Sequence, residues 1–119
     1  MIEGKVWGTT ELIFKNSNCE VHRIFIGKGG FCSMHKHEHK HNLFYVDSGH
    51  LRVTVEKTDY KLTDTTILLP GQKTSVKPGQ FHKFEALEET YALEIYYTEP
   101  ISSDIIRKDC GGINGTQHN

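Results

Sequence analysis

Short runs of β-branched and aromatic residues, each ended by turn residues, constrain the fold of this chain most strongly. No stretch of about a dozen residues carries apolar positions at helical spacing. The runs expected to form strands are 11–14, 21–26, 31–37, 43–46, 51–56, 66–69, 74–76, 81–86 and 91–98. Strands separated by turn signals about every eight to twelve residues predict an all-β domain, either a sandwich or a small barrel.

The length and charge of the chain favour a single domain with a small-molecule ligand. A chain of 119 residues with a net charge of −1 can bury one core and carries no clustered basic face. We therefore expect no nucleic-acid or membrane partner. The expected domain is 1–119, with its core at about 5–98 and a C-terminal extension at 99–119.

The cysteines and the N-terminal residues predict a cytoplasmic setting. Cys19, Cys32 and Cys110 form an odd set with no Cys-x-x-Cys pair, which favours reduced thiols. The chain begins Met1-Ile-Glu-Gly-Lys, which lacks the apolar stretch of a signal peptide.

Histidines are the residues with the clearest chemical meaning. Four of the eight alternate along one short stretch, at His35, His37, His39 and His41, and His82 follows far downstream. Neutral imidazole is the commonest protein ligand for transition metals. Side chains two apart on a strand share a face, so a His-x-His pair can direct two nitrogens at one point.

The spacing of glycines around these histidines resembles the pattern of a known family. The two segments are Gly29-x5-His35-x-His37-x4-Asn42-x6-Gly49 and Pro78-Gly79-x2-His82. In this pattern the chain resembles the cupin superfamily over about residues 20–98. The resemblance implies a double-stranded β-helix, or jelly-roll barrel, in which His35, His37 and His82 hold one divalent transition metal (Zn, Ni, Fe, Mn or Co). A metal-free pocket is the alternative, since some cupins lack the metal.

The fourth ligand departs from the family pattern. Asn42 stands where that pattern has glutamate, so the first shell would be all neutral. His41 is the better ligand by chemistry, but it is one residue out of register and would lie on the opposite face of a strand. Both alternatives stay open from the sequence. His39 is expected to be a solvated loop residue.

Further residues are expected to line the pocket. By strand alternation, Phe44 and Val46 share the face of Asn42, Phe84 shares the face of His82, and Phe31 and Ser33 share the face of His35. Arg23 could bind an anionic substrate on the inner face.

The strand at 91–98 leaves two orientations open. In the first, Glu94 and Tyr96 face inward and supply an acid/base pair. In the second, Leu93 and Ile95 form core and Glu94 lies outside.

Three functions follow from the resemblance. The segment Gly4-Lys-Val-Trp-Gly-Thr-Thr-Glu11 is similar to the start of the cupin half of type II mannose-6-phosphate isomerases. This favours metal-assisted isomerisation or epimerisation, or lyase chemistry, on a sugar or sugar phosphate. The alternatives are a cupin dioxygenase and a binding module without turnover. We also expect a homodimer formed through exposed sheet edges.

Overall fold

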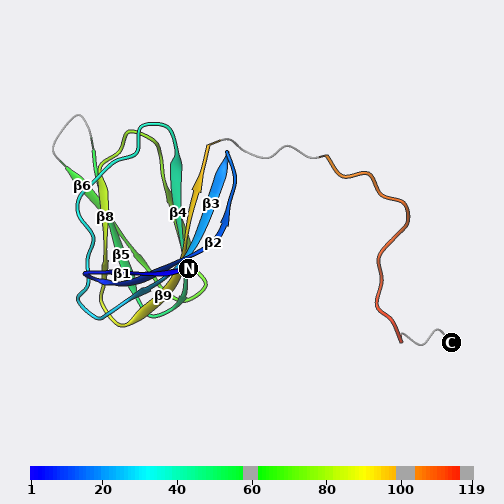
Figure 1. Ribbon diagram of the computed structural model, residues 1–119, viewed down its shortest axis with the longest axis horizontal. Helices are drawn as coiled ribbons and strands as arrows, with labels where there is room; N and C mark the ends of the chain where they lie inside the picture. The colour runs from blue at the N-terminus through cyan, green and yellow to red at the C-terminus, as the bar shows by residue number, and fades with distance from the viewer. Residues whose placement is uncertain (58–61, 99–103, 116–119) are drawn as a thin grey trace.

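The computed structural model describes residues 1–57, 62–98 and 104–115, and these contain nine strands and no helix (Figure 1). The strands are β1 (Ile2–Lys5), β2 (Gly8–Lys15), β3 (Cys19–Ile26), β4 (His41–Ser48), β5 (Leu51–Glu56), β6 (Thr63–Leu68), β7 (Lys73–Val76), β8 (His82–Ala86) and β9 (Thr90–Tyr97). They form two antiparallel sheets, with strand orders β1-β2-β3-β9-β4-β7 and β6-β5-β8. The expected all-β architecture is confirmed.

Two-residue alternation places the core between the two sheets. In β4, every second residue from Asn42 to Val46 is buried, and β8 buries His82, Phe84 and Ala86 in the same way. The core side chains are Ile24, Ile26, Phe44, Val46, Leu51, Val53, Leu68, Val76, Phe84, Ala86 and Ala92. Facing strands therefore supply one apolar centre and, at one end of it, a set of polar side chains.

Gly49 lets the chain pass from one sheet to the other. It lies between β4 and β5 with a φ of +94°, a conformation that favours glycine. A Cβ at this position would lie 2.2 Å from the carbonyl oxygen of Glu89. Because β4 and β5 belong to different sheets, this turn does not close a hairpin.

The segment carrying the first two histidines is not a strand. Residues 31–37 make only two isolated bridges, Phe31 to Glu85 and His35 to His82. Backbone hydrogen bonds link the segment to β8 and its flanks, including Cys32 N–H to the Phe84 carbonyl at 3.2 Å. The expected strand at 31–37 is therefore wrong, whereas the strand at 51–56 has the predicted bounds as β5.

The two ends of the chain are built differently. Residues 2–5 form β1, which was not predicted, because pairing with β2 outweighs their weak strand pattern. Residues 104–115 have no strand or helix, are exposed and lead away from the sheets (Figure 1). The rest of the expected extension lies outside the described residues. No described segment is a helix long and apolar enough to cross a membrane.

Candidate metal centre and pocket

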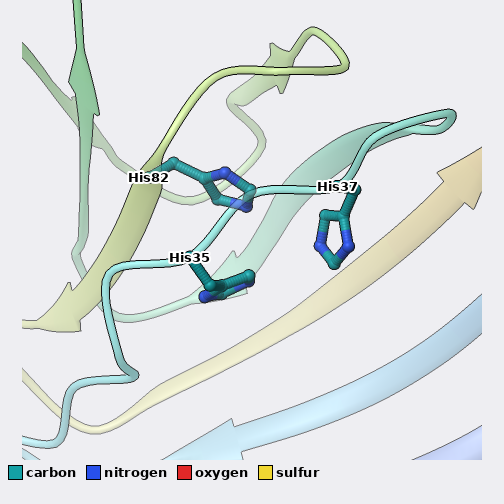
Figure 2. Close-up of side chains that lie close together, drawn as sticks. All are labelled: His35, His37 and His82. Atoms are coloured by element: carbon teal, nitrogen blue, oxygen red, sulfur yellow. The ribbon is translucent and has the colours of Figure 1, made fainter.

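Three histidines meet at one end of the space between the sheets. His35 and His37 come from the 31–37 segment, and His82 opens β8 (Figure 2). One ring nitrogen of each lies within 4.8 Å of the others. The ring centroids of His35 and His82 are 4.6 Å apart, and those of His37 and His82 are 5.5 Å apart. The structure thus brings together the three residues that the sequence selected.

Backbone carbonyls hold two of the rings in a defined tautomer. His35 Nδ1 lies 2.7 Å from the Ser33 carbonyl oxygen, and His82 Nδ1 lies 3.0 Å from the Gln80 carbonyl oxygen. Because a carbonyl only accepts, each Nδ1 carries the proton and donates it. Each Nε2 then has a free lone pair. In histidines that bind a metal through one ring nitrogen, the other nitrogen commonly donates its hydrogen to a carbonyl in this way.

The side chain of Asn42 lies beside the histidines. Its Oδ1 lies 3.1 Å from His82 Nε2, so two lone-pair atoms face one another. The Asn42 amide nitrogen is buried near Glu94 but makes no hydrogen bond of regular geometry. His41 instead stacks its ring on Tyr97, with centroids 4.8 Å apart. Its side chain therefore lies on the opposite face of β4 from Asn42.

Burial keeps two of the imidazoles neutral. Desolvation lowers the pKa of His37 to about 4, with the nearby His35, Lys40 and His82 charges acting in the same direction. Desolvation also lowers the pKa of His82, against the opposing hydrogen bond to the Gln80 carbonyl. Neutral rings near pH 7 are the form that binds a metal.

The donor set fits a divalent transition metal. His37 Nε2 is buried and has no hydrogen-bond partner within the described ranges, so this polar atom is left for an ion to satisfy. Imidazole ligands suit Zn, Ni, Fe and Cu, and the three-histidine cluster can therefore hold such an ion.

A cavity of about 240 Å³ opens beside the cluster and reaches His35, Glu94 and Tyr96. Glu94 and Tyr96 lie on the inner face of β9, while Leu93 and Ile95 lie on its outer face. Burial raises the pKa of Glu94, which is only 8% exposed, and the neighbouring Tyr96, His22 and Asn42 side chains oppose that rise. Burial likewise raises the pKa of Tyr96. Of the two orientations that the sequence left open for this strand, the structure has the one in which Glu94 and Tyr96 face inward.

A second polar group on the same wall was not predicted from the sequence. His22 was not selected, yet its Nε2 lies 2.9 Å from Glu20 Oε2 and its Nδ1 lies 3.3 Å from Thr10 Oγ1. The hydrogen bond with His22 lowers the pKa of Glu20, with Lys40 and Lys15 acting in the same direction. The alternation of β3 could have located His22, because it shares the inner face of Ile24 and Ile26.

Three of the expected pocket residues lie elsewhere. Arg23 is on the outer face of β3, since its neighbours in sequence, His22 and Ile24, face inward. Phe31 is 60% exposed and Ser33 is exposed, because the 31–37 segment lacks the regular alternation of a strand.

The other expected wall residues are inside. Phe84 lines the cavity and packs edge-on against Trp7, with centroids 5.1 Å apart. Phe44 lies beside His82, with centroids 6.3 Å apart, and Val46 belongs to the core. Trp7 and Cys32 also line the cavity, and burial raises the pKa of the Cys32 thiol to about 11. This thiol is therefore protonated near neutral pH.

Comparison with solved structures identifies the architecture. KdgF from a Halomonas species superposes with a TM-score of 0.72 at 16% identity, over 84% of this chain and 87% of that one. An RmlC-like cupin from Shewanella frigidimarina gives 0.70 at 20% identity, over 83% and 84%. The chain has the cupin fold. Oxalate decarboxylase from Bacillus subtilis gives 0.73 at 17% identity, and the match covers 86% of this chain but 28% of that longer chain.

The likeness is structural, and no family model or curated protein matches the chain. Within the cupin fold, the three histidines lie at one end of the space between the sheets, on β8 and on the bridge-forming segment beside it. The resemblance stated from the glycine and histidine spacing is therefore confirmed at the level of the fold.

Proposed function

We propose that this cupin is a metal-dependent enzyme that moves a proton on a small polar metabolite, such as a sugar or sugar phosphate, without net oxidation. The observation that carries the proposal is the buried Glu94 carboxyl, which lines the same cavity as the metal-ligand candidate His35. A module that only binds needs no buried carboxyl with a raised pKa, whereas an acid/base catalyst does.

The chain's own residues divide into three tasks. His35, His37 and His82, with Asn42, would hold the ion, which supplies Lewis-acid polarisation of a bound oxygen. Glu94 holds or releases a proton, and Tyr96 beside it donates a hydrogen bond. Trp7 and Phe84 form an apolar wall, which suits the C–H face of a sugar ring and excludes water.

The His22 and Glu20 pair supports the same chemistry from the neighbouring strand. His22 lies opposite Glu94 in the register between β3 and β9, and Glu20 lies opposite Tyr96. Of the two, His22 lines the cavity, so it provides a second proton-binding group near Glu94. The three cysteines are unpaired, which supports a reducing, cytoplasmic setting for this enzyme.

Solvent deuterium exchange tests the proposal even when the product is unidentified. Untagged protein is loaded with Zn, Mn, Co, Ni or Fe and incubated in D₂O with aldoses, ketoses and their phosphates. Proton transfer next to a carbonyl then appears in NMR spectra as loss of a C–H signal. We expect exchange that is unchanged without oxygen and is reduced at least about 100-fold by Glu94→Gln.

Glu85→Gln is the matched control, because Glu85 lies on the outer face of β8 and pairs with Arg52 at 2.8 Å. It should leave the exchange rate unchanged. Absence of exchange with every sugar would contradict the proposal. Turnover that requires oxygen would favour the dioxygenase alternative instead.

A further inference from the structure

A second cavity, of about 320 Å³, shares one wall residue with the cavity beside the histidine cluster. Tyr96 lines both of them. The second cavity lies where β9 ends beside the turn between β2 and β3 (Figure 1). The Thr98 N–H donates to the Asn18 carbonyl there, at 3.1 Å. We call this space the lysine cavity, because Lys15 and Lys40 both line it.

Lys40 is a half-buried cation without a carboxylate partner. Its Nζ lies 4.0 Å from the centroid of the Tyr96 ring, and its side chain is partly covered. Within residues 1–57, 62–98 and 104–115, no carboxylate forms an ion pair with it. An aromatic ring attracts a cation but brings no net negative charge. Because a charge that loses water is normally paired, an anion is the group that Lys40 lacks.

Glu20, the carboxylate in the wall of the lysine cavity, is already engaged on both of its oxygens. Its Oε1 lies 3.5 Å from Lys15 Nζ, and its Oε2 lies 2.9 Å from His22 Nε2. Glu20 therefore offsets the charge of Lys15. The charge of Lys40 is left to make the wall positive.

We propose that the lysine cavity holds an anionic group of the substrate, a phosphate or a carboxylate, with Lys40 as its charge partner. The inference rests on the proposed function and narrows its substrate class to anionic sugars. Lysine is a common partner of phosphate in proteins. Asn16 adds a donor to the wall, since its Oδ1 accepts from the Asn18 and Cys19 N–H groups at 2.8 Å and its amide nitrogen stays available.

The distance from Lys40 to the metal centre suits one small molecule that contacts both. The Tyr96 centroid lies 4.0 Å from Lys40 Nζ and 5.0 Å from the His37 ring centroid, so the last two are at most 9.0 Å apart, the sum of these distances. This limit is within the length of a sugar phosphate. Arg23, which the sequence favoured for binding an anion, lies on the outer face of β3, and we assign that role to Lys40.

Calorimetric titration of the zinc-loaded full chain tests the proposal without turnover. The probes are two matched pairs, mannose-6-phosphate with mannose and glucuronate with glucose. We expect the anionic member of at least one pair to bind at least about tenfold more tightly than its neutral partner, and Lys40→Gln to remove that preference. The pair that shows the preference identifies the anionic group.

Lys28→Gln is the matched control. It removes the same charge from an exposed lysine that pairs with Glu88 at 3.8 Å and does not line the cavity, so it should keep the wild-type preference. No measurable binding of either anionic probe, no preference in wild type, or equal preference in Lys40→Gln and Lys28→Gln would overturn the proposal.

Two further variants separate the charge of Lys40 from its packing on Tyr96. Lys40→Arg keeps a cation that can lie over the ring and should keep the preference within about threefold, whereas Lys40→Met keeps most of the apolar length and should lose it. Equal loss in both would assign the effect to packing and refute a charge partner. Lys15→Gln should weaken binding only about twofold, because Lys15 is exposed and paired with Glu20. A larger loss there than in Lys40→Gln would refute the choice of Lys40.

Deuterium exchange keeps the failure of this inference distinct from failure of the proposed function. A binding preference that depends on Lys40, without exchange in any sugar, would contradict the proposed function alone. Exchange that depends on Glu94, with the same anion preference in Lys40→Gln as in wild type, would contradict the anion site alone.

Discussion

His35 and His82 exchange both of their backbone hydrogen bonds. The His35 N–H donates to the His82 carbonyl at 3.0 Å, and the His82 N–H donates to the His35 carbonyl at 2.7 Å. The two residues form an isolated antiparallel bridge, in which His82 belongs to β8 and His35 belongs to no strand. This bridge, together with the Ser33 and Gln80 carbonyls behind the rings, sets both imidazoles before any ion arrives.

Removal of one imidazole should disable the metal centre. His82→Ala takes away one of three convergent ligands, so Zn affinity should fall at least about 100-fold. His39→Ala is the matched control, because His39 is an exposed neighbour in the same histidine run. Competition with a chromophoric chelator measures both. Equal affinities of the two variants would show that zinc binds to the surface run and not to the cluster.

A carboxylate at the fourth position should strengthen the centre and weaken the metal-free protein. Asn42→Asp places a negative charge near His82 Nε2, which lies 3.1 Å from Asn42 Oδ1, at a fully buried site. Zn affinity should rise about tenfold or more through charge attraction. Without metal, the buried charge should lower the free energy of unfolding by about 1–3 kcal/mol.

Calorimetric metal titration and chelator-treated denaturation curves measure these two effects of Asn42→Asp. Metal affinity should rise, whereas the free energy of unfolding of the metal-free protein should fall. A variant that leaves metal affinity unchanged would place Asn42 outside the ligand set. Asn18→Asp, in an exposed turn, serves as the charge control.

The metal-free protein should lose stability on acidification because of His37. Its pKa is about 4 when folded and 6.5 in the reference state, so between these values the unfolded chain binds a proton that the folded chain does not. The free energy of unfolding should therefore fall as pH drops from about 6.5 to 4, and level off below.

Urea denaturation at several pH values, with a chelator present, measures this slope for wild type and His37→Gln. The variant should show a shallower fall in the same window. His82 has a lowered pKa as well and contributes a residual slope to both proteins. Identical slopes would mean that the His37 ring is not desolvated in solution.

Two glycines with similar backbone angles should respond differently to alanine. Gly49 has a φ of +94°, and a Cβ there would lie 2.2 Å from the Glu89 carbonyl oxygen, whereas Gly71 has a φ of +85° and open space around it. Gly71→Ala should cost about 1 kcal/mol from the backbone angle alone. Gly49→Ala should cost about 3 kcal/mol or more, since strain and a clash add. Thermal denaturation compares the two, and equal losses would contradict the packing argument.

Local patterns account for most of what could be predicted about the strands. Strand β5 was located to the residue because Leu51, Val53 and Val55 alternate with polar neighbours. The same alternation could have placed His22 inside and Arg23 outside, since Ile24 and Ile26 mark the inner face of β3. Strand β1 had no such pattern, because it is stabilised by pairing with β2 and buries nothing.

The sequence by itself singled out three of the eight histidines, because the spacing of glycines and histidines resembles the cupin pattern. Gly29, Gly49 and Gly79 in that pattern all adopt a positive φ. Only the tertiary structure decided how those histidines converge. Residues 31–37 follow β8 through bridges and not through a regular strand, so which side chains face inward there depends on long-range backbone contacts. For the same reason, only the packed sheets could show Glu94 on the same cavity as His35, with His22 opposite Glu94 on the neighbouring strand.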